Sequence, residues 1–272
     1  MIDSKYTLAE LCIAACAEVW RDEGEILATG IGLIPRLAAG LAKYTVNPAL
    51  MMTDAEAFLV TEPVPVGPRN GYKPAIEGWM PYSRTFDLLW GGKRHALVGP
   101  VQVDRYGQMN ISAIGDYAKP KAALLGVRGY PGNSISHRNS MFVPNHSTRV
   151  FVAGECDVVC SVGINPARWP DGKRPAAFGL GCIITDLAVL DFGGPDEQIR
   201  VRSLHPGVTL AQVQKNTGFA LVANVALPIT SAPTAQQLEF IRTRLDPHNQ
   251  RAGVFKGDPP GDRRAAVHGA LA

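Results

Sequence analysis

The chain has 272 residues, of which 46% are hydrophobic and 19% charged, a composition typical of a globular protein with a substantial core. The net charge of +3, without a dense block of Lys and Arg, argues against a nucleic-acid-binding protein. Residues 1–24 lack a basic start and a cleavage site, and no apolar run approaches the ~18 residues of a membrane span. We therefore expect a cytoplasmic protein with no membrane association.

The first half of the chain alternates predicted helices and strands. A capping box, Thr7-Leu-Ala-Glu10, predicts the start of a first helix. Hydrophobic runs and turn residues then predict a strand at 25–29, a turn at 30–32, a helix at 33–44 and a buried strand at 49–53. This order implies a parallel strand pair joined by a right-handed crossover. A long Pro-rich connection at 60–85, regular structure at 86–90 and a strand at 95–103 follow.

The second half is predicted to contain mostly short strands. The expected elements are strands at 122–125, 149–153 and 158–162, a hairpin at 181–192 that turns at Thr185-Asp186, and its antiparallel neighbour at 199–204. Two more capping boxes, at 209–212 and 234–237, each predict a helix. From 247 the sequence becomes rich in Gly, Pro and Arg. We therefore predict one domain at 1–246 and an extended tail at 247–272.

Common catalytic and metal-binding signatures do not fit this sequence. The five cysteines lack the spacing of a zinc site and are typical of buried thiols in a reducing compartment. Gly30-x-Gly32-x-x-Pro35 lacks the third glycine of a dinucleotide fingerprint. This turn could bind an anion through free N–H groups, or its glycines could serve only to make a tight turn. No Gly-x-Ser-x-Gly nucleophile elbow is present.

Several segments resemble, in the same order, the β-type half of family I coenzyme A transferases. They are the glycine-rich turn and helix at 29–42, Gly99-Pro-Val-Gln-Val-Asp-Arg-Tyr-Gly107 with Asn110, Gly126-Val-Arg-Gly-Tyr-Pro-Gly132, Ile183-Ile-Thr-Asp-Leu-Ala-Val-Leu-Asp191, and residues 206–218. The resemblance covers most of residues 5–245. It implies an α/β, CoA-transferase-like (NagB/RpiA-like) fold with a mixed, mainly parallel sheet flanked by helices. It also implies an antiparallel hairpin late in the chain.

The resemblance fails where that family carries its nucleophile. In the family, a strand ends in Ser-Glu-Asn-Gly, and the glutamate takes CoA as a covalent thioester. Here the corresponding residues are Thr53-Asp54-Ala55-Glu56, so Asp54 takes the place of the glutamate and is one methylene shorter. Asp54 is the candidate catalytic residue and Glu56 a candidate substrate contact. Either could instead be a turn residue.

The other candidate substrate contacts follow the glycine-rich loop that, by resemblance, lies against the acyl-CoA. Arg128 and Gly129 are within that loop. His137, Arg138 and Asn139 come shortly after it. Arg can bind a carboxylate through two hydrogen bonds, and His can relay a proton near neutral pH. The alternative is a solvated loop or a subunit contact.

Within the family, residues 115–121, 126–133 and 136–142 resemble the β subunit of the ring-opening hydrolases of bacterial steroid breakdown. That resemblance implies hydrolysis of a carbon–carbon bond in a cyclic oxo-enoyl acyl-CoA. It also implies an α subunit that supplies the principal base, an α2β2 assembly, and no metal or cofactor beyond the CoA of the substrate. A CoA transferase that uses Asp54 as nucleophile and a non-catalytic scaffold subunit are the alternatives.

Overall fold

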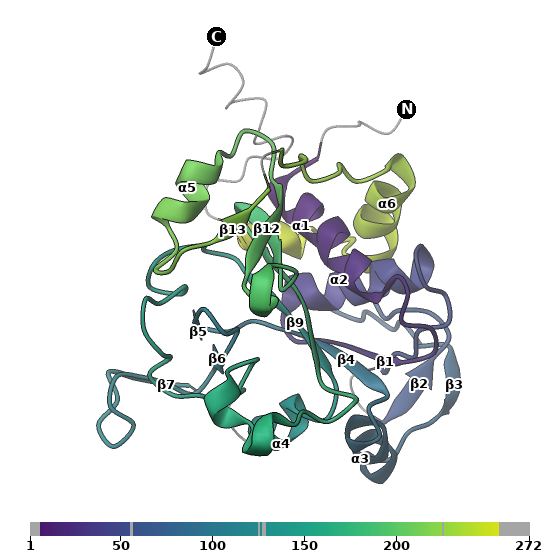
Figure 1. Ribbon diagram of the computed structural model, residues 1–272. Helices are drawn as coiled ribbons and strands as arrows, with labels where there is room; N and C mark the ends of the chain where they lie inside the picture. Colours follow the sequence, from purple (N-terminus) through teal and green to yellow (C-terminus); the bar gives the residue numbers. More distant parts are fainter. Residues whose placement is uncertain (1–5, 55–56, 125, 127–128, 225, 256–272) are drawn as a thin grey trace. The chain divides into compact units, whose positions relative to one another are not determined.

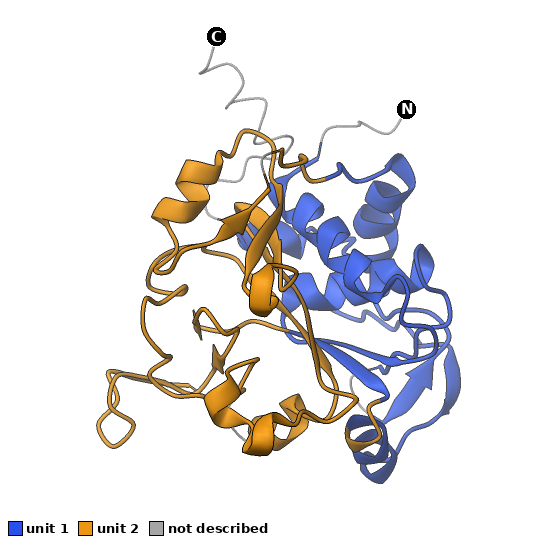
Figure 2. Cartoon of the chain, in the orientation of Figure 1, with its two compact units in different colours: residues 1–89, 93–97, 231–272 blue, residues 90–92, 98–230 orange. Residues whose placement is uncertain are grey.

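The computed structural model describes residues 6–54, 57–124, 126, 129–224 and 226–255. The chain divides into two compact units (Figure 2). Unit 1 comprises residues 1–89, 93–97 and 231–272, and unit 2 comprises residues 90–92 and 98–230. Figure 1 shows the elements of both units and labels many of them.

Unit 1 is built mainly from helices and a parallel strand pair. Its elements are α1 (Leu8–Ala17), η1 (Glu18–Trp20), β1 (Leu27–Gly30), α2 (Leu33–Tyr44), β2 (Phe58–Val60), β3 (Ile76–Trp79), α3 (Tyr82–Trp90), β4 (Arg94–Val98), α6 (Ala235–Glu239), the π-helix η5 (Phe240–Leu245) and η6 (Gln250–Gly253). β1 and β4 are parallel, with Leu27 opposite Arg94. α1 packs against α2, and α2 packs against β1 and η5. The predicted helix at 33–44 is confirmed.

Gly40, which has no side chain, allows the close approach of α2 and η5. A Cβ added to Gly40, in the middle of α2, would lie 2.6 Å from a methyl carbon of Leu245 and 3.1 Å from Pro63. Such a contact is shorter than van der Waals packing permits. Gly40 therefore favours this packing although glycine weakens a helix interior.

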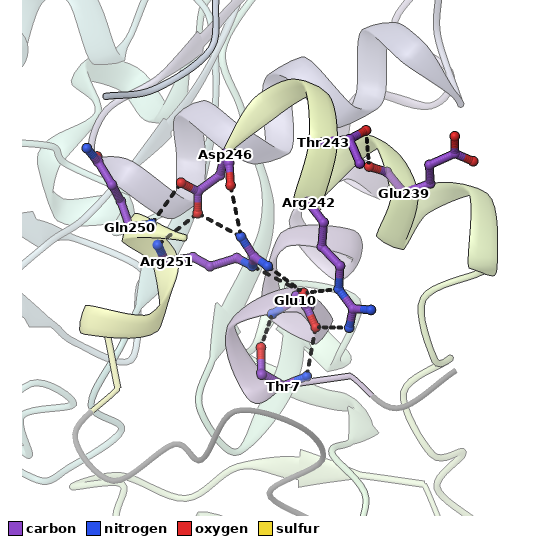
Figure 3. A network of polar contacts seen from close by, with 8 residues as sticks. All are labelled: Thr7, Glu10, Glu239, Arg242, Thr243, Asp246, Gln250 and Arg251. Atoms are coloured by element: carbon purple, nitrogen blue, oxygen red, sulfur yellow. Dashed lines mark hydrogen bonds and ion pairs between the residues drawn. The ribbon is translucent and has the colours of Figure 1, made fainter. Parts of the chain in front are cut away.

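The N-terminal helix α1 is buried on nearly all sides, so its one acidic residue, Glu10, needs hydrogen-bonding or ionic partners inside the protein. Glu10 is 1% exposed, and a buried carboxylate is unfavourable unless it is paired. Figure 3 shows these partners: Arg242 and Arg251, from the C-terminal part of unit 1, both donate hydrogen bonds to Glu10. Arg251 also donates to Asp246 at 3.0 Å. The backbone N–H of Thr7 completes the capping box at 2.9 Å from Glu10.

Parts of unit 1 differ from the prediction. Residues 49–53 form only isolated bridges, Leu27 with Met51 in parallel and Thr53 with Leu59 in antiparallel orientation. The chain turns back at Asp54, so no continuous strand develops. The predicted irregular segment 60–85 is partly regular, because β2 and β3 pair in antiparallel fashion and α3 begins at Tyr82.

Unit 2 contains the late part of the sheet. Its elements are β5 (Gln102–Val103), β6 (Met109–Asn110), β7 (Ala113–Ile114), β8 (Ala122–Ala123), α4 (Tyr130–Ser134), β9 (Arg138–Val143), β10 (Gly179–Thr185), β11 (Ala188–Asp191), β12 (Arg200–Leu204), α5 (Leu210–Lys215), β13 (Val222–Ala223) and the short 3-10 helices η2 (Pro166–Arg168), η3 (Pro170–Gly172) and η4 (Pro195–Glu197). The pairs β9–β10 and β12–β13 are parallel, whereas β10–β11 and β11–β12 are antiparallel. These pairings confirm the late hairpin and its antiparallel neighbour.

Two predicted segments of unit 2 do not form strands. Residues 149–153 and 158–162 contribute only single bridges, Val103 with Phe151 and Met109 with Ser161. Their partner strands β5 and β6 have two residues each, so longer ladders cannot form. The strand predicted at 95–103 is likewise divided into β4 and β5.

The predicted boundary at residue 246 falls inside a described segment, which continues to residue 255. Arg251 and Phe255 are buried there. Residues 256–272 of the predicted tail lie outside the described residues.

Candidate functional site

Asp54 lies in unit 1, in the turn that follows the bridge between β1 and residue Met51. Its side chain is 2% exposed. Asp54 Oδ1 accepts a hydrogen bond from the backbone N–H of Phe58 at 3.2 Å, and the Asp54 N–H donates to the carbonyl of Phe58 at 3.0 Å. The aspartate therefore closes its own turn. The short side chain reaches this N–H without leaving the turn, which is a common role of Asp.

Two arginines that no sequence pattern singles out interact with Asp54. Arg69 Nη2 donates to the backbone carbonyl of Asp54 at 2.9 Å. Arg36, in the first turn of α2, is half-buried. Burial and then the positive charge of Arg69 lower the pKa of Arg36, while the carboxylate of Asp54 acts in the opposite direction. Glu56, the second candidate acid, lies outside the described residues.

The polar residues after the glycine-rich loop form a compact group in unit 2. Gly129 has a left-handed φ of 64° and precedes α4 directly. His137 and Asn139 are fully buried at the start of β9. The side-chain N–H of Asn139 donates to the carbonyls of Ser134 and His137 at 2.7 and 3.0 Å.

The geometry of this group ties the loop to the strand. His137 Nδ1 lies 2.9 Å from the carbonyl of Arg138, and the hydroxyl of Tyr130 donates to Asn139 at 3.4 Å. The structure thus brings three of the predicted contacts, His137, Arg138 and Asn139, together with α4, and only Arg138 is exposed. Arg128 lies outside the described residues. A substrate role for these residues stays a prediction.

The segment that resembles the Gln-Val-Asp motif of CoA transferases is a buried hydrogen-bonded framework. Asn110 donates to Gln102 at 2.7 Å, and Gln102 donates to Asp157 at 3.1 Å. Asp104 accepts from Gln108 Nε2 at 2.5 Å. Burial raises the pKa of Asp104, against the opposing effect of these hydrogen bonds. These residues shape the turns of unit 2 by satisfying one another.

The late hairpin is held by two buried histidines. His146 contacts the hydroxyls of Thr185 and Thr217 at 3.1 and 2.9 Å. His205 Nε2 lies 2.8 Å from the carbonyl of Thr185. Burial lowers the pKa of His146 to about 4, so this imidazole is neutral at pH 7. A neutral, hydrogen-bonded imidazole of this kind supports the hairpin turn rather than a proton relay.

Among the described residues no group of three or more His, Cys, Asp or Glu side chains is placed to hold a metal ion. All five cysteines are thiols outside any disulfide, and burial raises the pKa of Cys156, Cys160 and Cys182. A protonated, buried thiol is a weak ligand and a weak nucleophile.

Unit 2 also contains a pocket of about 500 Å³. Residues of several loops line it: Arg105, Tyr106, Ile164, Pro166, Arg174, Asp196, Glu197, Gln198, Ile199, Phe219 and Ala220. Arg174 is held by Glu197 through two short ion pairs. None of the predicted site residues lines this pocket. Within the described residues, no helix is long and apolar enough to cross a membrane.

Known proteins of one enzyme type align with nearly the whole chain. The cholesterol ring-cleaving hydrolase IpdB subunit of Rhodococcus jostii is 40% identical over 91% of this chain and 96% of its own length. The IpdB subunit of Mycobacterium tuberculosis is 42% identical over 90% of this chain and 97% of its own length. The chain belongs to the IpdB branch of the CoA transferase family. No family model matches the sequence.

Solved structures of related proteins have the same fold as this chain. The crystal structure of Rhodococcus jostii IpdAB matches with a TM-score of 0.84 at 39% identity, covering 92% of this chain and 98% of that one. The decarboxylase AibA/AibB matches with a TM-score of 0.75 at 27% identity, covering 92% of this chain and 98% of that one. A subunit of the 3-oxoadipate CoA-transferase of Pseudomonas knackmussii is 33% identical over 88% of this chain and 93% of its own length. One scaffold thus serves proteins named for hydrolysis, decarboxylation and CoA transfer.

Proposed function

We propose that this chain is the β subunit of a two-subunit hydrolase that opens the last carbocyclic ring of the steroid nucleus. The substrate is a cyclic oxo-enoyl acyl-CoA. The identity of 40–42% with IpdB subunits along nearly their whole length carries this proposal. The aspartate at position 54 supports it, because this side chain is one methylene shorter than the nucleophilic glutamate of the transferases and reaches less far toward an acyl carbonyl.

The reaction adds water to a ring carbonyl and then breaks the adjacent carbon–carbon bond. The bonding electron pair moves to the carbon that the conjugated thioester stabilises as an enolate, and that carbon then takes a proton. The oxygen of water ends in a new carboxylate, while CoA stays on the product. The step needs a base for water and hydrogen-bond donors for the oxyanion.

Asp54 is the acid of this chain that we place at the reacting centre. Its buried carboxylate has one oxygen bound to the Phe58 N–H, which fixes its direction. We propose that the α subunit supplies the principal base and that Asp54 orients the substrate. No metal or redox cofactor is required, because the thioester of the substrate stabilises the carbanion.

The proposed partner is an α-type subunit, in an α2β2 assembly. The matched structures of IpdAB and AibA/AibB carry two-subunit names. Unit 1 also exposes large aromatic side chains on β3 and α3, with Trp79 70% and Tyr82 78% exposed. Exposed aromatic groups of this size are typical of protein interfaces. The five thiols, none of them in a disulfide, support action in the reducing cytoplasm.

Co-expression with the α subunit and mass spectrometry in ¹⁸O-labelled water test the proposal. A cyclic β-keto acyl-CoA should give a ring-opened acid that carries one label in its new carboxylate and still carries CoA. An unopened ring, with or without loss of CoA, would refute the hydrolase assignment.

CoA transfer is the second candidate, because the 3-oxoadipate CoA-transferase chain is 33% identical to this one. It predicts a CoA thioester on Asp54 after incubation with an acyl-CoA, which peptide mass spectrometry would detect. A scaffold role without catalysis predicts unchanged turnover in Asp54→Asn, His137→Gln and Arg138→Met, provided that the assembly remains intact.

A further inference from the structure

Two arginines interact with the turn that contains Asp54, Arg69 through a hydrogen bond and Arg36 electrostatically. Arg36 lies in the first turn of α2, which starts directly after β1. Asp54 follows the segment in which Met51 pairs in parallel with Leu27 of β1. Both residues therefore lie beyond the carboxyl end of β1, the edge at which α/β sheets usually bind ligands. Arg69 reaches the same turn and donates to the Asp54 carbonyl at 2.9 Å.

Among the residues that the structure describes, positive charge is in excess at this edge. Arg36 is half-buried, yet its guanidinium makes no hydrogen bond or ion pair with any residue that the structure describes. Arg69 donates to a backbone carbonyl rather than to a carboxylate. Asp54 is the one described acid that acts on Arg36, and the charge of Arg69 opposes it. A bound anion would relieve both the partial desolvation of Arg36 and its repulsion from Arg69.

The chemistry of the side chains favours a carboxylate as that anion. A guanidinium presents paired N–H donors that match the two oxygens of a carboxylate. Arg36 extends from a helix and Arg69 from a loop, so two separate elements can approach one planar anion. Asp54 Oδ1 is engaged by the Phe58 N–H at 3.2 Å.

We infer that Arg36 and Arg69 form a subsite that binds the carboxylate created by ring opening. This inference rests on the proposed function, because it takes the ring-opened acyl-CoA as the natural ligand. In the ring-opening step, the oxygen of water and the former ring-carbonyl oxygen become the two oxygens of this carboxylate. The subsite would therefore hold the product end that the uncleaved substrate lacks.

Calorimetric titration of the purified αβ complex with adipate tests the subsite without requiring turnover. Adipate carries the carboxylate but no CoA, and adipamide is the uncharged control. We expect adipate to bind at millimolar concentration and adipamide not to bind. Arg36→Met and Arg69→Met should each raise the Kd for adipate at least tenfold. Arg84→Met, which removes an exposed arginine paired with Asp87, should leave the Kd unchanged.

Two further variants keep the test decisive. Arg36→Lys retains the charge but not the paired donors, and it should give an intermediate Kd even if the methionine variant folds poorly. Glu56→Gln tests whether that carboxylate already neutralises Arg36. An unchanged Kd supports the subsite, whereas a tenfold tighter Kd would mean that Glu56 occupies it and would overturn the inference.

Product inhibition connects the subsite to the reaction. Arg36→Met should raise the inhibition constant of the ring-opened acyl-CoA at least tenfold. If the ring is opened but adipate binding and product inhibition do not depend on Arg36, the subsite is refuted and the hydrolase assignment stands. If adipate binding depends on Arg36 but no ring is opened, the assignment to the product fails while the carboxylate subsite remains.

Discussion

Glu10→Gln should strongly destabilise unit 1, because the carboxylate of Glu10 is the shared partner of two arginines. Arg242 and Arg251 donate to it at 2.8–3.1 Å, and Glu10 is 1% exposed. Glutamine keeps the length of the side chain and can still complete the capping box with Thr7. The substitution therefore removes charge with little change in shape.

The magnitude follows from what each arginine loses. Breaking a buried ion pair costs about 3–5 kcal/mol, because the remaining charge stays desolvated. Arg251 keeps Asp246 as a second partner, and the Arg242 side chain is 27% exposed. Both facts place the expected loss near the lower limit, at about 3 kcal/mol.

Urea titration followed by far-UV circular dichroism measures this loss. Glu18→Gln is the matched control, because Glu18 pairs with Arg21 across three residues at the surface, with 42% and 52% of the two side chains exposed. An exposed pair of this kind contributes about 0–1 kcal/mol. Equal free energies of unfolding for the two variants would refute the argument that the buried network stabilises unit 1.

The same network predicts a dependence on acid. Burial alone would raise the pKa of Glu10, but hydrogen bonds from Arg242 and Thr7 and the charge of Arg251 together lower it below 4.5. A lowered carboxyl pKa stabilises the folded state above the unfolded value, and this contribution is lost as the pH falls below 4.5 toward the folded pKa. Glu10→Gln should remove this part of the acid sensitivity.

Three further outcomes follow from the structure. Burial lowers the pKa of His146 from 6.5 to about 4, so the unfolded state binds a proton more readily between these values. As the pH falls through this range, the free energy of unfolding should decrease by up to about 3 kcal/mol. His146→Asn should flatten this pH profile in unfolding titrations. Gly163→Ala places a Cβ against the carbonyl of Tyr106. Gly172 is the control, because it also has a left-handed φ but open space around it. By thermal denaturation, Gly163→Ala should lower the free energy of unfolding by at least about 2 kcal/mol more than Gly172→Ala. Trp79→Ser should raise the Kd for the α subunit about 30-fold, which corresponds to about 2 kcal/mol, as measured by titration calorimetry. An unchanged Kd would exclude the aromatic surface around Trp79 from the interface.

Local signals in the sequence predict local structure well. All three capping boxes form, and the structure contains both reciprocal hydrogen bonds in each. The late hairpin also forms, since β10 and β11 pair through Ile183 and Leu190. Each of these features depends on residues that are close together in the chain, so their pattern is visible without the fold.

Long-range contacts are not visible in the sequence. The pattern around Glu10 indicates only a capping residue, because its arginine partners lie more than 230 residues away in the chain. No sequence pattern marks Arg36 and Arg69, because their interaction with Asp54 depends on how the chain folds beyond the carboxyl end of β1. The strands predicted at 149–153 and 158–162 are wrong for a related reason: apolar composition does not reveal that the partner strands are two residues long.

The location of the similarity to CoA transferases explains how one scaffold can serve a different reaction. Gln102, Asp104 and Asn110, which carry much of the resemblance, are buried, and they hydrogen-bond to one another, to the side chain of Gln108 or to the neighbouring backbone. A motif of this kind maintains the fold and places no demand on the reaction, so it is compatible with hydrolysis as well as transfer. We propose that the reaction depends instead on the turn at Asp54, where a shorter acid has one oxygen engaged by the Phe58 N–H. A carboxylate held in this way is poorly suited to attack an acyl carbonyl, which agrees with the proposal that Asp54 orients the substrate and that the partner subunit supplies the base.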